Sequence, residues 1–277
     1  MPGCLRKAAA VRGDLRMLAG LALAGFLVLP LVPLLGWSVA QGWRFPALVP
    51  DRLSAQAWSF ALSPQSGVLA SFAITTLIAA ATTLLAILIG LPAGRALGLY
   101  RFRGRGLVIL LLLAPALLPG IAVVFGLHGI LLRAGLAGTI PGVILAHLVP
   151  VLPYVTLVMA AVFARFDPAF EDQARSLGAT PWQTFRAVTL PAILPGLMIA
   201  ALFAFLVSWS QYLLTLSVGG GRVQTLPLLL FSFASAGRND ITAAIALLYI
   251  LPGLLVLAVT ARRITGRGAA LTERLHP

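Results

Sequence analysis

Few side chains in this chain can carry out acid–base, nucleophilic or metal chemistry. Its 277 residues include seven acidic residues, three histidines, one cysteine and one lysine. Nucleotide hydrolysis through a P-loop needs a lysine in the pattern GxxxxGK[ST], and Lys7 lies in no such pattern. His128 and His147 lie far apart in apolar stretches without a carboxylate, which makes a poor metal site. We therefore expect no catalytic residue, no metal ligand and no cofactor on this chain.

One segment, residues 167–191, contains both acidic and basic residues and lies between two strongly apolar stretches. The segment carries three acidic residues and two arginines: Asp167, Glu171, Asp172, Arg175 and Arg186. Charged side chains are costly in contact with lipid. We therefore expect this segment to meet water or a soluble partner.

The segment begins with the signals of a short helix. Asp167 can accept a hydrogen bond as an N-cap, and Pro168 suits the first helical position. Glu171 and Asp172 follow near the first turn, where the helix dipole favours negative charge. Gly178 suits the left-handed position that ends a helix. These residues predict one short helix that ends at Gly178.

A second short helix is predicted directly after this glycine. Thr180 can cap its first turn, and Gln183 stands at the position that completes a capping box. We expect the helix to run to Leu190 and to stop at Pro191, because the residue before a proline disfavours helical backbone. The segment thus becomes two short helices about a glycine turn, which is more structure than a simple connection needs.

The elements that position this segment must be helices that cross a membrane. The chain is 60% hydrophobic and only 10% charged, whereas a soluble domain carries about a quarter charged residues. A spanning helix needs about 20 mostly apolar residues, and lipid cannot satisfy the edge of an open sheet. We therefore predict an all-α, polytopic membrane protein with six transmembrane helices. The predicted spans are Met17–Val39, Val68–Gly94, Leu107–Leu127, Ile140–Phe163, Ile193–Val218 and Ile241–Ala261.

The formal charge of +13 is interpreted as a signal of orientation, not of nucleic acid. Fifteen of the 20 Lys and Arg residues lie in the N-terminus, two alternate loops and the C-terminus. Because basic loops stay on the cytoplasmic side, both termini and the charged segment are predicted to be cytoplasmic. The predicted organisation is a basic cytoplasmic N-terminus over 1–16, a transmembrane domain over 17–262 with a loop over 164–192, and a cytoplasmic tail over 263–277.

The charged segment resembles the EAA loop of binding-protein-dependent ABC importer permeases. That pattern is Glu-Ala-Ala, three residues, Gly, nine residues, then Ile-x-Leu-Pro. Here Asp172-Gln173-Ala174 precedes Gly178 by three residues, and Val188-Thr189-Leu190-Pro191 follows nine residues later. The sequence departs from the pattern at Asp172, Gln173 and Val188, and Glu171 could supply the acidic role instead.

The resemblance continues in the second half of the chain. Ser208-Trp209-Ser210-Gln211-Tyr212, Gly219-Gly220-Gly221 and Thr225-Leu226-Pro227 are similar to the late region of polyamine, ferric iron and thiamine type permeases. With the spans, the resemblance covers roughly residues 68–262. It implies a type I importer fold in a bacterial inner membrane. It also implies a substrate that is a polyamine, thiamine or ferric iron-like solute.

The resemblance further implies partners and roles for the charged segment. The segment would be a coupling helix that docks on a cytoplasmic ABC ATPase, which would hold ATP and Mg²⁺. A second permease subunit, identical or homologous, and an extracytoplasmic binding protein would complete the transporter. The residues implied to couple to the ATPase are Glu171, Asp172, Ala174, Arg175, Gly178, Leu190 and Pro191.

Polar residues in the fifth predicted span allow two interpretations. Ser208, Ser210, Gln211, Tyr212 and Thr215 could line a translocation pathway. Equally, such side chains often form hydrogen bonds between helices in membranes. The sequence favours neither interpretation strongly.

Two other classes of function remain as alternatives. An ion-coupled secondary transporter usually has acidic or histidine residues inside the membrane, yet all seven acidic residues lie outside the predicted spans. A membrane-embedded enzyme would need a nucleophile with a base, or a metal cluster, and no motif supports one. Dependence on a nucleotide-binding partner would distinguish an ABC permease from both.

Overall fold

The computed structural model describes residues 20, 22, 25–26, 28–43, 47, 49–50 and 52–273, with side chains as far as residue 256. The predicted basic N-terminus, residues 1–16, lies outside the described residues. The chain divides into two compact units: residues 1–68 with 230–248, and residues 69–229 with 249–277. The charged segment belongs to the second, larger unit.

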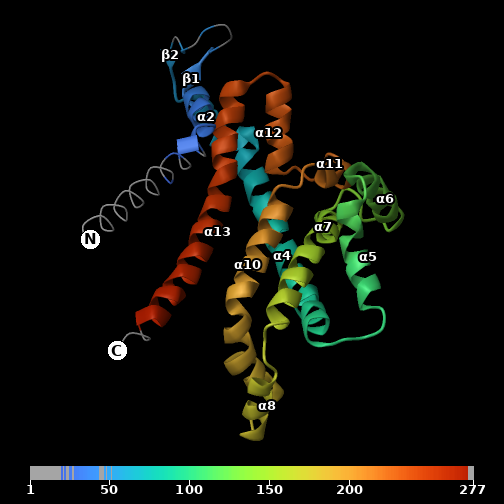
Figure 1. The fold of residues 1–277 in the computed structure, drawn as a ribbon. Coiled ribbons are helices and arrows are strands. Elements are labelled where there is room, and N and C mark those ends of the chain that lie inside the picture. Colours follow the sequence, from blue (N-terminus) through green and yellow to red (C-terminus); the bar gives the residue numbers. More distant parts are fainter. Residues whose placement is uncertain are drawn as a thin grey trace, which may run out of the picture. The chain divides into compact units, whose positions relative to one another are not determined.

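Three long helices form the centre of the larger unit: α4 (Val68–Leu99), α7 (Ile140–Phe163) and α10 (Leu190–Trp209). Buried residues of all three, among them Ala86, Val155, Met159 and Ala200, form one apolar cluster. In Figure 1, α8 (Ala169–Ser176) lies beyond the end of α7, away from α6 and α11. Two of these helices, α7 and α10, thus adjoin the charged segment in the sequence.

Glycines allow α4 and α10 to approach α7 closely. A Cβ atom at Gly94 would lie 2.5 Å from the Cβ of Met159, and one at Gly98 would lie 2.6 Å from the carbonyl oxygen of Ala160. A Cβ at Gly196 of α10 would lie 2.3 Å from a methyl of Val162. Small residues commonly permit such contacts between membrane helices.

The third predicted span, Leu107–Leu127, is not one straight helix. The structure has α5 (Arg105–Leu117) and α6 (Gly120–Arg133), bent by 104° at the break. Leu118 has extended backbone, with ψ of 149°, because it precedes Pro119 and helical backbone is disfavoured there. The expectation of a continuous helix is therefore corrected.

The fifth predicted span, Ile193–Val218, is also divided. Helix α10 ends at Trp209, and α11 (Leu213–Gly219) begins after a short break. The side chain of Trp209 stacks on Phe205 and Tyr249 and donates a hydrogen bond to the carbonyl oxygen of Tyr249. The break places α11 against α6 and α7.

The smaller unit contains the elements near the first predicted span. These are α2 (Leu31–Ser38), strands β1 (Ala40–Gln41) and β2 (Arg52–Leu53), α3 (Gln56–Ala61) and the 3₁₀ turn η1 (Pro64–Ser66). The strands pair antiparallel, Ala40 opposite Leu53. They form a short exception to an otherwise helical fold, and they lie within a loop that the sequence predicted between the first two spans.

The remaining helices, α12 (Leu226–Ser235) and α13 (Asn239–Glu273), contribute to both units. Among the described residues, four helices are long and apolar enough to cross a membrane, or five if the bent pair counts as one span. Most of the first predicted span, Met17–Val39, lies outside the described residues. The number six and the cytoplasmic termini therefore stay predictions, and α13 continues as a helix into the predicted tail.

Candidate functional site

The first helix of the charged segment forms as the sequence predicts, with its start shifted by one residue. Helix α8 begins at Ala169, whose backbone N–H donates to Asp167 Oδ1 at 2.9 Å. Gly178 follows the helix with a φ of +87°, a conformation that strongly favours glycine. No atom lies within 4 Å of a Cβ built at Gly178. This glycine is therefore needed for its backbone conformation and not for space.

The second helix has the predicted capping box. Thr180 Oγ1 accepts from the N–H of Gln183 at 3.3 Å, and Gln183 Oε1 accepts from the N–H of Thr180 at 2.8 Å. Helix α9 (Pro181–Thr184) is short, however, and continues through a π turn, η2 (Phe185–Thr189), directly into α10.

The predicted stop at Pro191 is therefore wrong. Pro191 lies in the first turn of α10, where its missing N–H is tolerated because the preceding π turn changes the hydrogen-bond register. Leu190, the expected end of the second helix, is instead the first residue of α10. Residues 181–209 thus form one continuous helical rod from the charged segment into the apolar centre.

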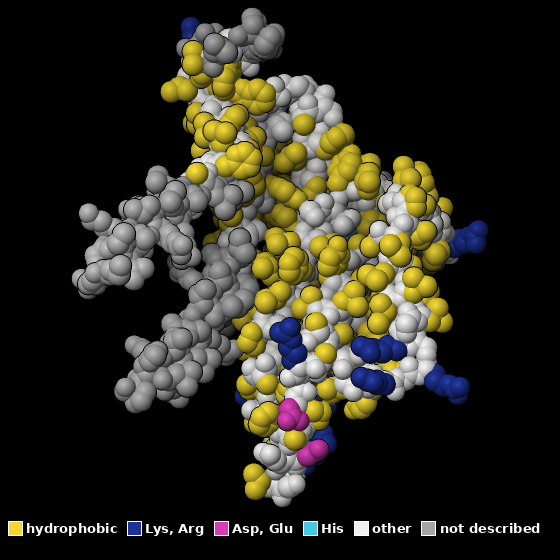
Figure 2. Space-filling view, viewed as in Figure 1, with side chains coloured by type: hydrophobic (Ala, Val, Ile, Leu, Met, Phe, Trp, Pro, Cys, Tyr) yellow, Lys and Arg dark blue, Asp and Glu magenta, His cyan; other side chains and the backbone are white. Residues whose placement is uncertain are grey.

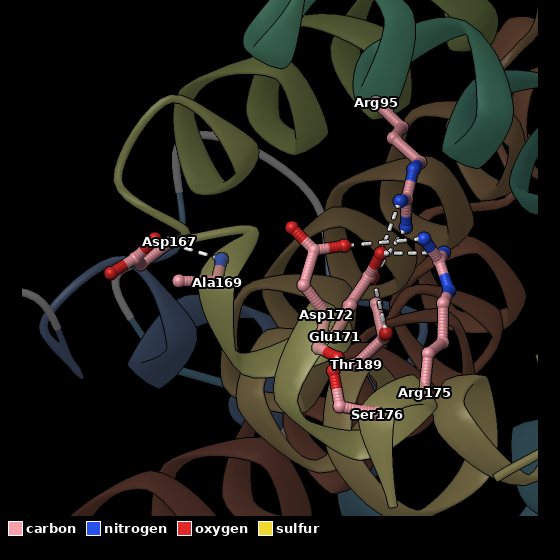
Figure 3. Close-up of polar contacts among 8 residues, drawn as sticks. All are labelled: Arg95, Asp167, Ala169, Glu171, Asp172, Arg175, Ser176 and Thr189. Carbon is pink, nitrogen blue, oxygen red and sulfur yellow. Dashed lines mark hydrogen bonds and ion pairs between the residues drawn. The ribbon is translucent and has the colours of Figure 1, made fainter. Parts of the chain in front are cut away.

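Glu171 is the most buried charged residue of the segment, at 3% exposed. Its carboxylate accepts two hydrogen bonds from Arg95 of α4, Nη1 to Oε1 at 2.7 Å and Nη2 to Oε2 at 2.6 Å. The hydroxyl group of Thr189, in the π turn, donates a hydrogen bond to the same carboxylate. Figure 3 shows Arg95 reaching Glu171 from a different helix, while Arg175 approaches from α8.

These contacts set the protonation of Glu171. The hydrogen bond from Arg95 is the largest effect and lowers the pKa of Glu171 below its usual value of 4.5, although burial opposes this. The hydrogen bond from Thr189 and the charge of Arg175 lower the pKa further. Glu171 is therefore ionised at neutral pH and is bound to its own chain.

The other predicted residues of the segment lie in different environments. The Asp172 side chain is 71% exposed, and it meets Arg175, itself about half exposed, at 3.4 Å. Ala174 is half-buried, Gly178 is exposed, Leu190 is half-buried and Pro191 is exposed. The structure thus divides the predicted set into Glu171, which faces the helices, and Asp172 and Arg175, which face solvent.

Three large apolar side chains on the surface of the segment were not predicted as site residues from the sequence. Phe170 is 56% exposed, Leu177 is 89% exposed and Trp182 is 66% exposed. All three lie on or directly beside the two short helices. Their positions beside charged residues in a predicted cytoplasmic loop could have indicated an exposed apolar face. Figure 2 shows acidic side chains at the end of this face that carries α8, and hydrophobic side chains over the helices beyond it.

The predicted pathway residues do not share one environment. Ser208 and Thr215 are buried, and both contact His147 of α7: Nδ1 lies 2.9 Å from Ser208 Oγ and Nε2 lies 3.0 Å from Thr215 Oγ1. Ser210 is exposed at the break between α10 and α11, while Gln211 and Tyr212 are half-buried there. Two of the five therefore form interhelical hydrogen bonds.

Among the described residues, no group of three or more His, Cys, Asp or Glu side chains could hold a metal ion. The site itself is a surface of helices, with a buried ion pair behind a mixed apolar and charged face.

Comparisons with known proteins agree on one family. Residues 83–264 match the family described as binding-protein-dependent transport system inner membrane component. The chain is 31% identical to the molybdenum transport permease ModB of Mycobacterium tuberculosis H37Rv, over 87% of this chain and 92% of that protein. It is 33% identical to the putrescine transport permease PotI of Escherichia coli K12, over 63% and 64%.

Solved structures share the fold. A bacterial ABC transporter that imports alginate matches with a TM-score of 0.67 at 18% identity, over 91% of this chain and 96% of that one. The MetNI methionine ABC transporter, in inward-facing conformations, matches with a TM-score of 0.55 at 20% identity, over 72% and 94%. The long apolar helices, the family match over most of the chain and these folds together make this protein a member of the binding-protein-dependent transport family, a multi-pass permease subunit of an ABC importer in the bacterial inner membrane.

Proposed function

We propose that residues 167–191 dock this permease on a separate cytoplasmic ABC ATPase. The observation that carries the proposal is the exposed face of the two short helices. Phe170, Leu177 and Trp182 expose apolar surface there, and Asp172 and Arg175 add charges beside it. Hot spots of protein interfaces are enriched in tryptophan, tyrosine and arginine, and this face offers Trp182 and Arg175. Family membership also removes the ion-coupled and enzymatic alternatives.

The continuous helix supports a mechanism for coupling. ATP and Mg²⁺ would be held by the partner ATPase, and closure of two ATPase subunits would move α8. The movement would pass through α9 and η2 into α10, because residues 181–209 form one helical rod. A second permease subunit would complete the pathway, and an extracytoplasmic binding protein would deliver substrate. Transport then follows from a shift between outward-open and inward-open states.

Gly178 provides the first test. In the reconstituted transporter, Gly178→Arg should abolish stimulation of ATP hydrolysis by the loaded binding protein, because a side chain is strained at a φ of +87°. Gly178→Asn is the matched control, since asparagine tolerates this conformation better, and it should retain much of the stimulation. Unchanged stimulation in Gly178→Arg would contradict the proposed role.

Leu177 provides a test of the docking face itself. Leu177→Ala should weaken ATPase binding by about tenfold or more, as expected for an interface anchor worth above about 1.4 kcal/mol. The control is Leu255→Ala, which alters another exposed leucine, on α13 and far along the chain. Binding measured by surface plasmon resonance on detergent-solubilised permease distinguishes the two. Equal affinities for Leu177→Ala and wild type would exclude this face as the docking site.

The proposed substrate class is narrower than the range of substrates for which the relatives are named. We propose a polyamine, thiamine or ferric iron-like solute, supported by the Ser208–Tyr212 region and by the putrescine permease among the relatives. Other relatives are named for molybdenum, trehalose and diacetylchitobiose. Calorimetric titration of the binding protein that stimulates this transporter tests the proposal. A binding protein that takes only molybdate or a sugar would overturn it.

A further inference from the structure

The EAA-like pattern assigns its acidic position to Asp172, but the structure gives the adjacent Glu171 the larger set of contacts. The side chain of Asp172 is 71% exposed, and that of Glu171 is 4% exposed. Residues one apart in a helix point about 100° away from each other. One carboxylate of α8 is therefore directed at solvent and the other at its own chain.

Arg95 holds Glu171 in a fixed geometry. Both guanidinium nitrogens Nη1 and Nη2 donate to separate carboxylate oxygens, an arrangement that fixes direction as well as distance. The guanidinium also lies 5.6 Å from the ring centroid of Phe163, the last residue of α7. Arg95 is therefore bound to α7 on one side and to α8 on the other.

The helix that carries Arg95 cannot move freely along α7. Gly94 and Gly98, on either side of Arg95 in the sequence, face the α7 backbone and leave no space for even one added methyl group. A displacement of Glu171 therefore acts on two packed helices, not on a flexible side chain.

Thr189 connects the same carboxylate to the start of α10. Its hydroxyl donates to Glu171 Oε1, the oxygen that also receives Arg95 Nη1. Thr189 is 1% exposed and is the last residue of the π turn. One carboxylate thus joins α8 to α4 and to the π turn before α10. Helices α4 and α10 both contribute to the apolar cluster around α7.

We propose that Glu171 is a positioning residue through which the movement of α8 reaches α4, in addition to the movement that residues 181–209 carry into α10. The inference rests on the proposed docking of α8 on an ATPase. It adds α4 to the helices that respond to the ATPase, because the continuous helix over residues 181–209 connects α8 only to α10. It also separates two roles: Glu171 couples helices within this chain, and Asp172, which is mostly exposed, is available to meet the ATPase.

The test compares Glu171→Gln with Asp172→Asn in the reconstituted transporter, because each removes one charge with little change in shape. Glu171→Gln should keep ATPase affinity within about twofold of wild type and reduce binding-protein stimulation of hydrolysis by about tenfold. Asp172→Asn should show the opposite pattern, weaker binding with stimulation retained at saturating ATPase. A merely structural role for Glu171 would lower binding and stimulation together, which would overturn the inference.

Hydrogen exchange can measure the response of α4 and the response of α10 separately. In wild type, addition of ATP should change the exchange of peptides from the end of α4 and from the start of α10. In Glu171→Gln, the change at α4 should be lost while the change at α10 persists. Loss of neither change, or of the α10 change alone, would overturn the inference.

Exchanging the charges of Arg95 and Glu171 tests whether their ion pair itself carries the coupling. The double variant Arg95→Glu with Glu171→Arg should restore part of the stimulation lost in either single variant. If the double variant does not fold, Thr189→Val offers a milder test and should reduce stimulation by a smaller factor than Glu171→Gln. No recovery, or no effect of Thr189→Val, counts against the inference. Failure of the wild-type permease to bind any ATPase would instead count against the proposed function itself.

Discussion

Glu171 and Asp172 are adjacent in the sequence but have opposite environments, one buried against Arg95 and one exposed. The spacing of the EAA-like pattern identified this turn of helix, and the caps around Gly178 and Thr180 were predicted correctly. The inward direction of Glu171 was not predicted. Its partner lies 76 residues earlier in the chain, and a contact at that separation depends on the packing of α4, which no local pattern reveals.

The lowered pKa of Glu171 predicts how stability depends on pH. A carboxyl group with a folded-state pKa below its unfolded value stabilises the fold above the unfolded pKa, and this stabilisation is lost as pH falls through the folded pKa. The melting temperature of wild type should thus exceed that of Glu171→Gln by a constant amount above about pH 4.5. The difference should shrink towards zero at lower pH.

Thermal unfolding of both proteins in detergent from pH 7 to pH 3 measures this difference. Asp172→Asn is the control and should give a smaller difference at every pH, because its carboxylate is mostly exposed and exposed ion pairs contribute little. A wild-type advantage that grows as pH falls would contradict the predicted sign.

His147 is a second buried polar residue whose partners come from distant parts of the chain. Its ring contacts Ser208 and Thr215. His147→Ala should lower stability by about 1–3 kcal/mol, because it leaves two buried hydroxyl groups without the ring as a partner. Thermal unfolding of the purified subunit measures this loss.

His128→Ala is the matched control for His147→Ala. His128 lies on α6, and its Nδ1 atom has no hydrogen-bond partner. Its removal should therefore cost clearly less than removal of His147. Equal losses in both variants would show that the contacts of His147 contribute nothing specific.

Among the helices, the close packing of α4 on α7 depends on glycines at regular spacing. Gly90, Gly94 and Gly98 recur every four residues and therefore lie on one face of α4. Each would place a Cβ within 3 Å of an atom of α7. This face of α4 was not predicted from the sequence. The signal was available, because small residues four apart are a known packing pattern of membrane helices.

Gly94→Ala tests this packing. The added methyl group would force α4 and α7 apart, and overpacking of this kind costs about 1–3 kcal/mol. Gly129→Ala is the control, because no atom lies within 4 Å of a Cβ at Gly129 of α6 and alanine favours helix. Thermal unfolding in detergent should show a loss only for Gly94→Ala. An equal loss of stability in Gly129→Ala would show that the effect of Gly94→Ala does not come from close packing of α4 on α7.

Helix boundaries were predictable where apolar runs end at turn residues and not where a run contains a break. Ile140–Phe163 was predicted with the bounds that the structure has. The break before Pro119 and the one after Trp209 lie inside long apolar runs, so hydropathy alone could not locate them. At Pro191 the error was the reverse: a stop was predicted where the π turn lets the helix continue.

For the whole molecule, the orientation in the membrane is the main remaining prediction. The distribution of Lys and Arg predicts that α8 is cytoplasmic and that the turn between α6 and α7 is on the other side. Helix α7 connects these two places, and its 24 residues span about 36 Å at 1.5 Å per residue, enough to cross the apolar core of a bilayer.

Cysteine labelling can test this orientation, because one substitution, Cys4→Ser, makes the chain free of cysteine. In that background, Ala134→Cys and Ser176→Cys each introduce one cysteine at an exposed position. A maleimide that does not cross membranes should label intact spheroplasts through Ala134→Cys only. After the membrane is permeabilised, both variants should react. Labelling of Ser176→Cys in intact spheroplasts would reverse the predicted orientation.

The π turn Phe185–Thr189 also determines what kind of motion the charged segment can deliver. A π turn holds about one residue more per turn than an α-helix, and an α-helix rotates by about 100° per residue. Relaxation of this single turn to α-helical geometry would therefore twist α9 about the axis of α10 by about that angle. The π turn thus holds one extra residue, whose release would rotate the charged segment relative to α10. A uniform α-helix over residues 181–209 would have no such residue to release.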